Sequence, residues 1–154
     1  MPFSGHMNRG LHGRLVNSLY IEAMVMADEA RAYFSAQGDA DRDELAVPAR
    51  IGFSCESLKV TTRLMHVIAW LMAQRGWQRG EIGEHALADP KYLLGEAAPT
   101  DAVVLADFPF AARALIEGSA DLYDRVARLQ AMMRGERDAA EGARALMDRL
   151  EQAF

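Results

Sequence analysis

Apolar side chains recur every three or four residues along most of this chain, which is the spacing of one face of an α-helix. The first stretch contains Leu15, Leu19, Ala23, Met26, Ala30 and Tyr33. It predicts a helix from Gly13 to about Gln37. Gly38 is expected to end this helix, because glycine commonly follows the last helical residue. The polar residues 38–44 are then a loop or a frayed helix entry, and the terminus with His6 and His12 is expected to be solvated.

A second helix is predicted from Pro48 to Gly76, with the proline in its first turn, where a missing amide hydrogen is tolerated. A third begins near Pro109 and is expected to stop at Gly135. Its stripe consists of Ala111, Leu115, Leu122, Val126, Leu129 and Met133. Between the second and third helices there is room only for a short helix before Pro90 and an irregular segment.

The last residues form a further amphipathic segment with one apolar side, consisting of Ala139, Ala143, Leu146, Leu150 and Phe154. We interpret residues 1–135 as a three-helix bundle domain and residues 136–154 as an amphipathic tail or a fourth helix. Short connections favour antiparallel neighbours, so the predicted fold is all-α, an up-down-up three-helix bundle with a short extra helix.

The second helix has an unusually broad apolar side. On a helical wheel Leu58, Val60, Leu64, Met65, Val67, Ile68, Ala69, Leu71 and Met72 cover roughly 200 degrees. An arc of this width fits contact with both other helices, or with one helix and a second subunit. Val60, Leu64, Val67 and Leu71 are therefore assigned to the core or to a dimer interface.

The opposite side of this helix is polar but contains two tryptophans. We single out Lys59, Arg63, His66, Trp70 and Trp77 as a candidate protein-binding surface, because Trp and Arg are enriched at binding hot spots. The alternative is that the segment from Arg79 to Leu94 folds back and covers both indoles. Both interpretations remain open from the sequence.

Composition restricts the class of protein. The 154 residues include a single cysteine and carry a formal net charge of −5, whereas nucleic-acid-binding proteins usually present a basic face. No apolar run approaches the roughly 20 residues that a membrane span needs. We expect a cytoplasmic protein that binds neither nucleic acid nor membrane.

Candidate chemistry is sparse. Glu81 and His85 are four residues apart on a possible helix, but one pair does not make a metal site. Cys55 is more consistent with packing than with catalysis, and the glycines match no phosphate-binding loop. The sequence therefore predicts no catalytic residues, no metal and no cofactor, and a protein that is not an enzyme.

The central helix resembles that of one known family, the regulator of CtrA degradation (RcdA) family of alphaproteobacterial adaptors for the ClpXP protease. The resemblance rests on Cys55-Glu56-Ser57, Thr61-Thr62-Arg63-Leu64-Met65, Trp70-Leu71, Gln74-Arg75 and Gly80-Glu81. Weaker similarity extends from Leu15 to Leu129. Cys55 stands where the family pattern has a serine, and Gly76 where it has a small helix former.

This resemblance implies a dimeric three-helix bundle that helps deliver cell-cycle regulators to ClpXP. The implied partners are ClpX, a receiver-domain adaptor, the proteolytic substrate and a cyclic-di-GMP effector. The alternative is a helical dimeric structural or signalling protein of the same fold without a role in proteolysis. The sequence does not identify the degraded substrate or the geometry of the homodimer.

Overall fold

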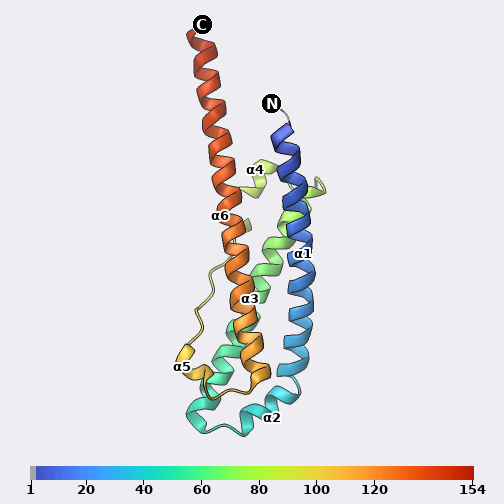
Figure 1. Ribbon diagram of the computed structural model, residues 1–154, viewed down its shortest axis with the longest axis vertical. Coiled ribbons are helices and arrows are strands. Elements are labelled where there is room, and N and C mark those ends of the chain that lie inside the picture. Colours follow the sequence, from blue (N-terminus) through green and yellow to red (C-terminus); the bar gives the residue numbers. More distant parts are fainter. Residues whose placement is uncertain (1–2) are drawn as a thin grey trace.

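The structure, a computed structural model, describes the backbone of residues 3–154 and the side chains from residue 10 onward. Within these residues the long helices are α1 (Phe3–Phe34), α3 (Val47–Gln78) and α6 (Phe110–Ala153) (Figure 1). The shorter elements are α2 (Gln37–Asp43), α4 (Glu84–Leu87), the 3-10 turn η1 (Pro90–Tyr92) and α5 (Ala102–Leu105). The described residues contain no strand, so the prediction of an all-α helical bundle is confirmed.

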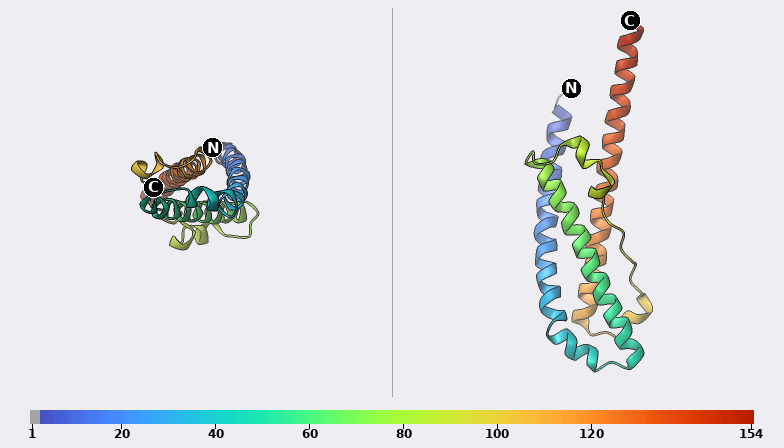
Figure 2. Two further views of the ribbon diagram at one scale, coloured as in Figure 1. Left: turned by 90° about the horizontal axis from the view of Figure 1, so that it is seen from below. Right: turned by 180° about the vertical axis from the view of Figure 1, so that it is seen from behind.

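The directions of the long helices differ from the predicted alternation. α1 and α3 are antiparallel and joined by α2, but α6 runs parallel to α3 (Figures 1 and 2). Arg63 of α3 contacts Ser119, whereas Trp70 lies near Gln130, so both helices advance in the same direction. The parallel arrangement requires residues 79–109 to return along the bundle. Their extended part, residues 94–101, is called the strap below; it lies alongside α6 (Figure 2).

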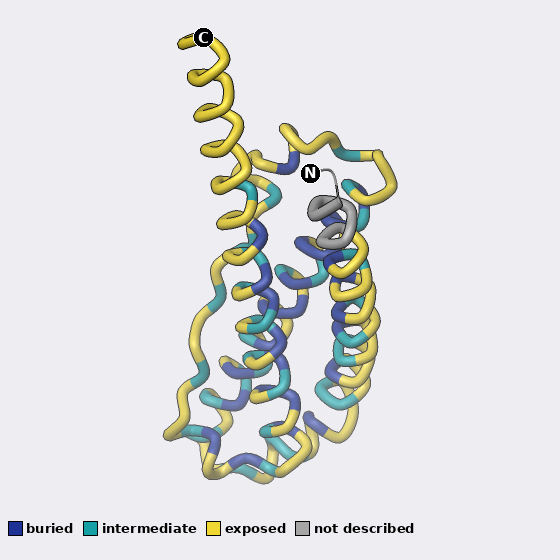
Figure 3. Tube along the Cα trace, turned by 45° about the horizontal axis from the view of Figure 1, so that its top comes forward, coloured by how far each residue is buried: buried dark blue, intermediate teal, exposed yellow. Residues whose placement is uncertain are grey.

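The core lies between the inner faces of the three long helices (Figure 3). It includes Val16, Ala23, Val60, Val67, Leu71, Ile116, Leu122 and Val126, all fully buried. At the α2 end, Phe53 makes edge-to-face contacts with Phe34 and Phe108, with ring centroids 5.8 and 5.2 Å apart. Each large apolar side chain buried in this way contributes roughly 1.5–3 kcal/mol.

The first helix has different limits from those predicted. α1 begins ahead of Gly13 and ends at Phe34, and residues 37–43 form α2 instead of a loop. Gly38 does not end α1 but lies within α2, where an added Cβ would be 2.8 Å from the Tyr33 carbonyl oxygen. Glycine therefore permits α2 to turn tightly against the end of α1. His12 is buried and lies 3.6 Å from Glu136, so the expectation of a solvated residue is wrong; the His6 side chain lies outside the described ones.

The second helix agrees with its prediction, with Pro48 in the first turn of α3. The short helix expected before Pro90 is α4. The third helix does not stop at Gly135, because α6 continues to Ala153. A helix-interior glycine costs only about 1 kcal/mol, and the strong helix formers around Gly135 offset this. The C-terminal segment is therefore a continuation of α6 that projects past the bundle, with every residue from 138 to 154 exposed (Figures 1 and 3).

Candidate protein-docking site

The side of α3 predicted to face outward is largely covered in the folded protein. Arg63 is 2% exposed and Trp70 is 3% exposed. An exposed position is therefore wrong for both residues, and for Trp70 the alternative of a covered indole holds. The physical reason is that α6 lies over this side of α3, together with the strap at Arg63 and residues 87–93 at Trp70. A helical wheel does not contain this cover. Lys59, His66 and Trp77 are partly exposed. That they contact a partner protein stays a prediction.

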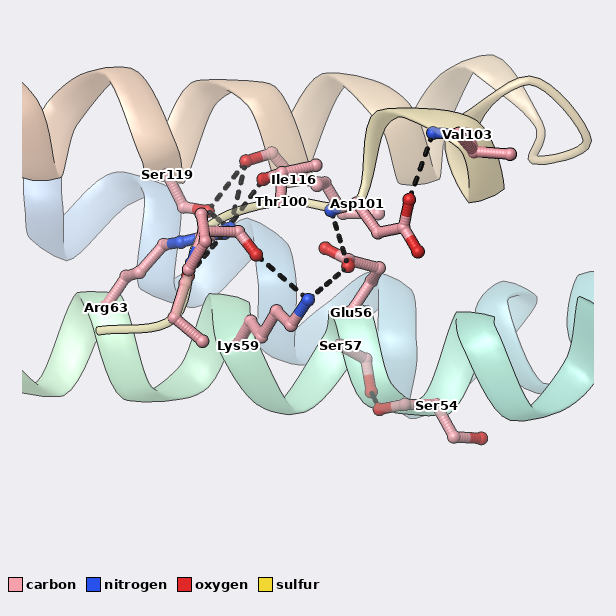
Figure 4. Close-up of polar contacts among 12 residues, drawn as sticks. Ser54, Glu56, Ser57, Lys59, Arg63, Thr100, Asp101, Val103, Ile116 and Ser119 are labelled. Atoms are coloured by element: carbon pink, nitrogen blue, oxygen red, sulfur yellow. Dashed lines mark hydrogen bonds and ion pairs between the residues drawn. The ribbon is translucent and has the colours of Figure 1, made fainter.

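The buried guanidinium of Arg63 joins three segments of the chain (Figure 4). Its Nη2 donates to the Ala98 carbonyl oxygen at 3.0 Å and to the Thr100 hydroxyl at 2.8 Å, both in the strap. Its Nη1 donates to the Ile116 carbonyl oxygen and to the Ser119 hydroxyl of α6. These acceptors are uncharged, so hydrogen bonds with fixed geometry satisfy a buried cation.

A second polar contact lies one to two turns before Arg63 on α3, at Lys59 and Glu56. The Lys59 ammonium donates to Glu56 Oε1 at 2.7 Å and to the Pro99 carbonyl oxygen at 2.9 Å. The same Glu56 oxygen accepts from the Asp101 amide at 3.1 Å. The Glu56 carboxylate is almost fully buried, and its Oε2 has no hydrogen-bond partner. α3 thus holds the strap with charged side chains of both signs.

Electrostatics stabilise this cluster as a unit. Burial lowers the pKa of the Arg63 guanidinium, while the charges of Glu56 and Asp124 act in the opposite direction. Arginine is effectively always protonated in proteins, so Arg63 remains a cation. Because isolated buried charges are expensive, Arg63 and Glu56 are expected to depend on each other.

The two tryptophans have different environments. Trp70 packs in the core and shares a small cavity with Leu87, Tyr92 and Leu93. The alternative in which the segment after α3 folds back over this indole therefore holds for Trp70. Trp77 is half-buried and lines an open pocket of about 510 Å³ between α1, α4 and α6.

The exposed apolar surface lies on another side of α3. Val60, Leu64, Val67 and Leu71 are buried in the core. Ile51, Leu58, Met65 and Met72, each seven residues after the last, are 56–67% exposed. We call these four residues the α3 apolar row. Beside it, a groove of about 340 Å³ between α1 and α3 is lined by Ala27, Ala30, Leu64, Met65 and Ile68 among others. This surface fits a protein partner better than a small ligand, because it is long and open.

Sequence reasoning missed the partners of Arg63, namely Ser119 and the strap. No local pattern marks them, because they are 35 to 56 residues distant from Arg63 along the chain. The sequence contained one signal for a buried role of Glu56. Glu56 lies three residues before Lys59 and seven before Arg63, which places all three on one side of a helix.

Within the described residues, no group of three or more His, Cys, Asp or Glu side chains could hold a metal ion. Glu81 precedes α4, so it does not share a helix face with His85 as predicted. No helix in the described part of the chain has the length and hydropathy of a membrane span.

Comparisons with known proteins give matches to a family model and to solved structures. The model of the family described as "Protein of unknown function (DUF1465)" matches residues 7–154. Among solved structures, the chain is similar to the crystal structure of RcdA from Caulobacter crescentus CB15, with a TM-score of 0.64 and 32% sequence identity. That match covers 77% of this chain and 90% of the RcdA chain. A comparison with curated proteins found no match.

Proposed function

This chain belongs to the DUF1465 family and, by its likeness to RcdA, to the RcdA family, and from this premise we propose that it is a non-enzymatic adaptor. In this proposal it helps deliver cell-cycle regulators to the ClpXP protease in the cytoplasm. Its partners are ClpX, a receiver-domain adaptor, the proteolytic substrate and a cyclic-di-GMP effector.

The observation that best supports an adaptor is the α3 apolar row. Four large apolar side chains at a heptad spacing are exposed beside an apolar groove, and such contiguous surfaces usually mark protein contacts. Met65 and Met72 add adaptability, because the unbranched Met side chain can repack against different partners.

We assign the proposed homodimer contact to this same row. A two-fold dimer places one surface against its own copy, and a row of large exposed apolar side chains along α3 is suited to such a contact. The other exposed surfaces, including the C-terminal part of α6, would then remain accessible to the protease and its partners.

A binding and degradation experiment tests the adaptor function. Purified protein should retain ClpX and a receiver-domain partner in a pulldown, and should accelerate ClpXP degradation of a cell-cycle substrate. Met65→Glu should weaken this activity, whereas Ser18→Glu, at an exposed polar position of α1, should not. A wild-type protein that neither binds these partners nor accelerates degradation would favour the alternative of a structural or signalling dimer without a protease role.

A further inference from the structure

The strap is held almost entirely through its main chain. Along residues 94–101, three carbonyl oxygens and two amides are bound by side chains of α3 and α6. At its start, the Leu94 amide donates to Gln130 Oε1 at 2.8 Å, and the Tyr123 hydroxyl donates to the Gly95 carbonyl oxygen at 2.7 Å. At its end, Arg63, Lys59 and Glu56 bind Ala98, Pro99 and Asp101 as described above.

Apart from Leu94, which packs against the hydrophobic core, and Thr100, the side chains of the strap contribute little to this recognition. Only Thr100 uses its side chain in the contacts with Arg63, and Glu96, Ala98 and Pro99 are exposed. The requirement at Gly95 is steric, because an added Cβ would be 2.7 Å from His66 Nδ1. The groove between α3 and α6 therefore accepts an extended chain with little or no side chain at one position, largely independently of its sequence.

The strap covers charges, which distinguishes it from an apolar lid. Arg63 and Glu56 are almost fully buried, and the Glu56 Oε2 and His66 Nδ1 atoms have no hydrogen-bond partner. Lifting the strap returns these groups to water, and their hydration offsets part of the hydrogen bonding that is lost. Leu94 is the one strap residue packed against the hydrophobic core, and segments with few apolar contacts are the ones that open most readily.

From these contacts we propose that the groove between α3 and α6 is a peptide-binding groove that the strap occupies in cis. Its partner is an extended segment of another protein, with glycine at the position facing His66 and small side chains beyond it. The strap competes with this segment and keeps the groove closed until it is displaced. This inference goes beyond the adaptor proposal and does not depend on ClpXP.

The strap itself supplies the probe. A fluorescent peptide with the sequence of residues 93–102 is titrated against the full-length protein, and binding is followed by anisotropy. Gly95→Ala should loosen the strap by contact with His66, and Thr100→Val should loosen it by removing the hydroxyl that accepts from Arg63. Both changes lie in the strap and leave the groove intact. Because apparent affinity scales with the fraction of open groove, we expect the peptide to bind Gly95→Ala at least about tenfold more tightly than wild type, and Thr100→Val with an intermediate affinity.

Matched controls separate groove binding from general loosening. Gly83→Ala changes a glycine with open space around it in the same connection and should leave the affinity at the wild-type value. A peptide with valine in place of Gly95 should not bind, whereas one with glutamine in place of the exposed Glu96 should bind normally. Hydrogen exchange should show faster exchange of the Leu94 and Asp101 amides in both loosened variants.

The proposal is overturned if the peptide binds neither loosened variant, or if it binds wild type and Gly95→Ala equally. It is also overturned if the valine-containing peptide binds as well as the original. If Gly95→Ala does not fold, Thr100→Val decides the question, because this change is nearly isosteric and leaves the groove residues unchanged.

Discussion

At the scale of single side chains, Trp70 and Arg63 show that residue types common at docking surfaces can instead stabilise the fold of their own chain. Both have the composition of a docking hot spot, but both are buried and contact their own chain. An indole in the core contributes through its large apolar area, and a buried guanidinium contributes by satisfying acceptors that would otherwise be unpaired.

The burial of Trp70 predicts the effect of its removal on stability. Trp70→Ala should lower the free energy of unfolding by about 3–5 kcal/mol, because it removes a large core side chain and leaves a cavity. Trp77→Ala, at the half-buried indole of the same helix, is the matched control and should cost less than half as much. Denaturant unfolding of both variants measures the two losses of stability. A small loss for Trp70→Ala would show that the indole is not a core residue.

The contact between Tyr33 and Asp41 predicts a dependence of stability on pH. The Tyr33 hydroxyl donates to Asp41 Oδ2 at 2.6 Å. Burial and then this hydrogen bond raise the pKa of Tyr33 above its ordinary value. Above about pH 10 the unfolded phenol loses its proton while the folded one keeps it, so the folded state binds more protons and stability falls as the pH rises.

Denaturant unfolding of wild type and Tyr33→Phe at about pH 8 and about pH 11 isolates this contribution. The wild-type protein should lose more stability between the two pH values than the variant, because the variant has no phenol at position 33 to titrate. An equal loss in both proteins would contradict the prediction.

Asp41 contributes to the pH dependence at the acidic end of the pH scale. Its hydrogen bond from Tyr33 lowers the pKa of the carboxyl group, so its contribution is lost on acidification.

At the scale of whole elements, the C-terminal part of α6 has the least support from the rest of the molecule. Residues 138–154 are all exposed, and helices without tertiary contacts are marginally stable in water. Deleting residues 136–154 should therefore change the free energy of unfolding by less than about 1 kcal/mol, with the helical signal per remaining residue preserved. The deletion removes the contact of His12 with Glu136, which involves a half-exposed carboxylate.

The same deletion should weaken partner binding in the pulldown, because the removed segment carries the exposed side chains Leu146, Met147, Leu150 and Phe154. The full-length protein assayed in parallel is the control. If the truncated protein is unfolded, the segment is instead an integral part of the bundle, and the division at residue 135 does not hold.

At the scale of the whole molecule, the surface of α3 predicts the state of association. Light scattering at micromolar concentration should give about twice the chain mass of 17.0 kDa, because burial of the α3 apolar row against a second copy is favourable. Met65→Glu should shift the mass towards the monomer, since it places a charge in an apolar contact. Ser18→Glu, which adds the same charge at an exposed position of α1, is the control. A wild-type mass of 17.0 kDa would rule out the dimer under these conditions.

The sequence by itself determined the helical class of the protein and the position of most elements. The spacing of apolar residues predicted α3 nearly to its ends, because this pattern depends only on local geometry. Pro48 and Pro90 marked the start of α3 and the region after α4, because proline restricts its own neighbourhood. Glycines were less reliable signals: Gly38 permits a close approach and Gly135 lies within a helix.

Only the tertiary structure decided how the helices are directed and which side of α3 is covered. A wheel gives the angular order of residues around a helix but not the directions of its neighbours. Here the strap allows α6 to run parallel to α3, and together they bury Arg63 and Glu56, while residues 87–93 and α6 cover Trp70 and Met65 and Met72 stay exposed. These arrangements rest on contacts between residues tens of positions distant along the chain, which no local pattern encodes.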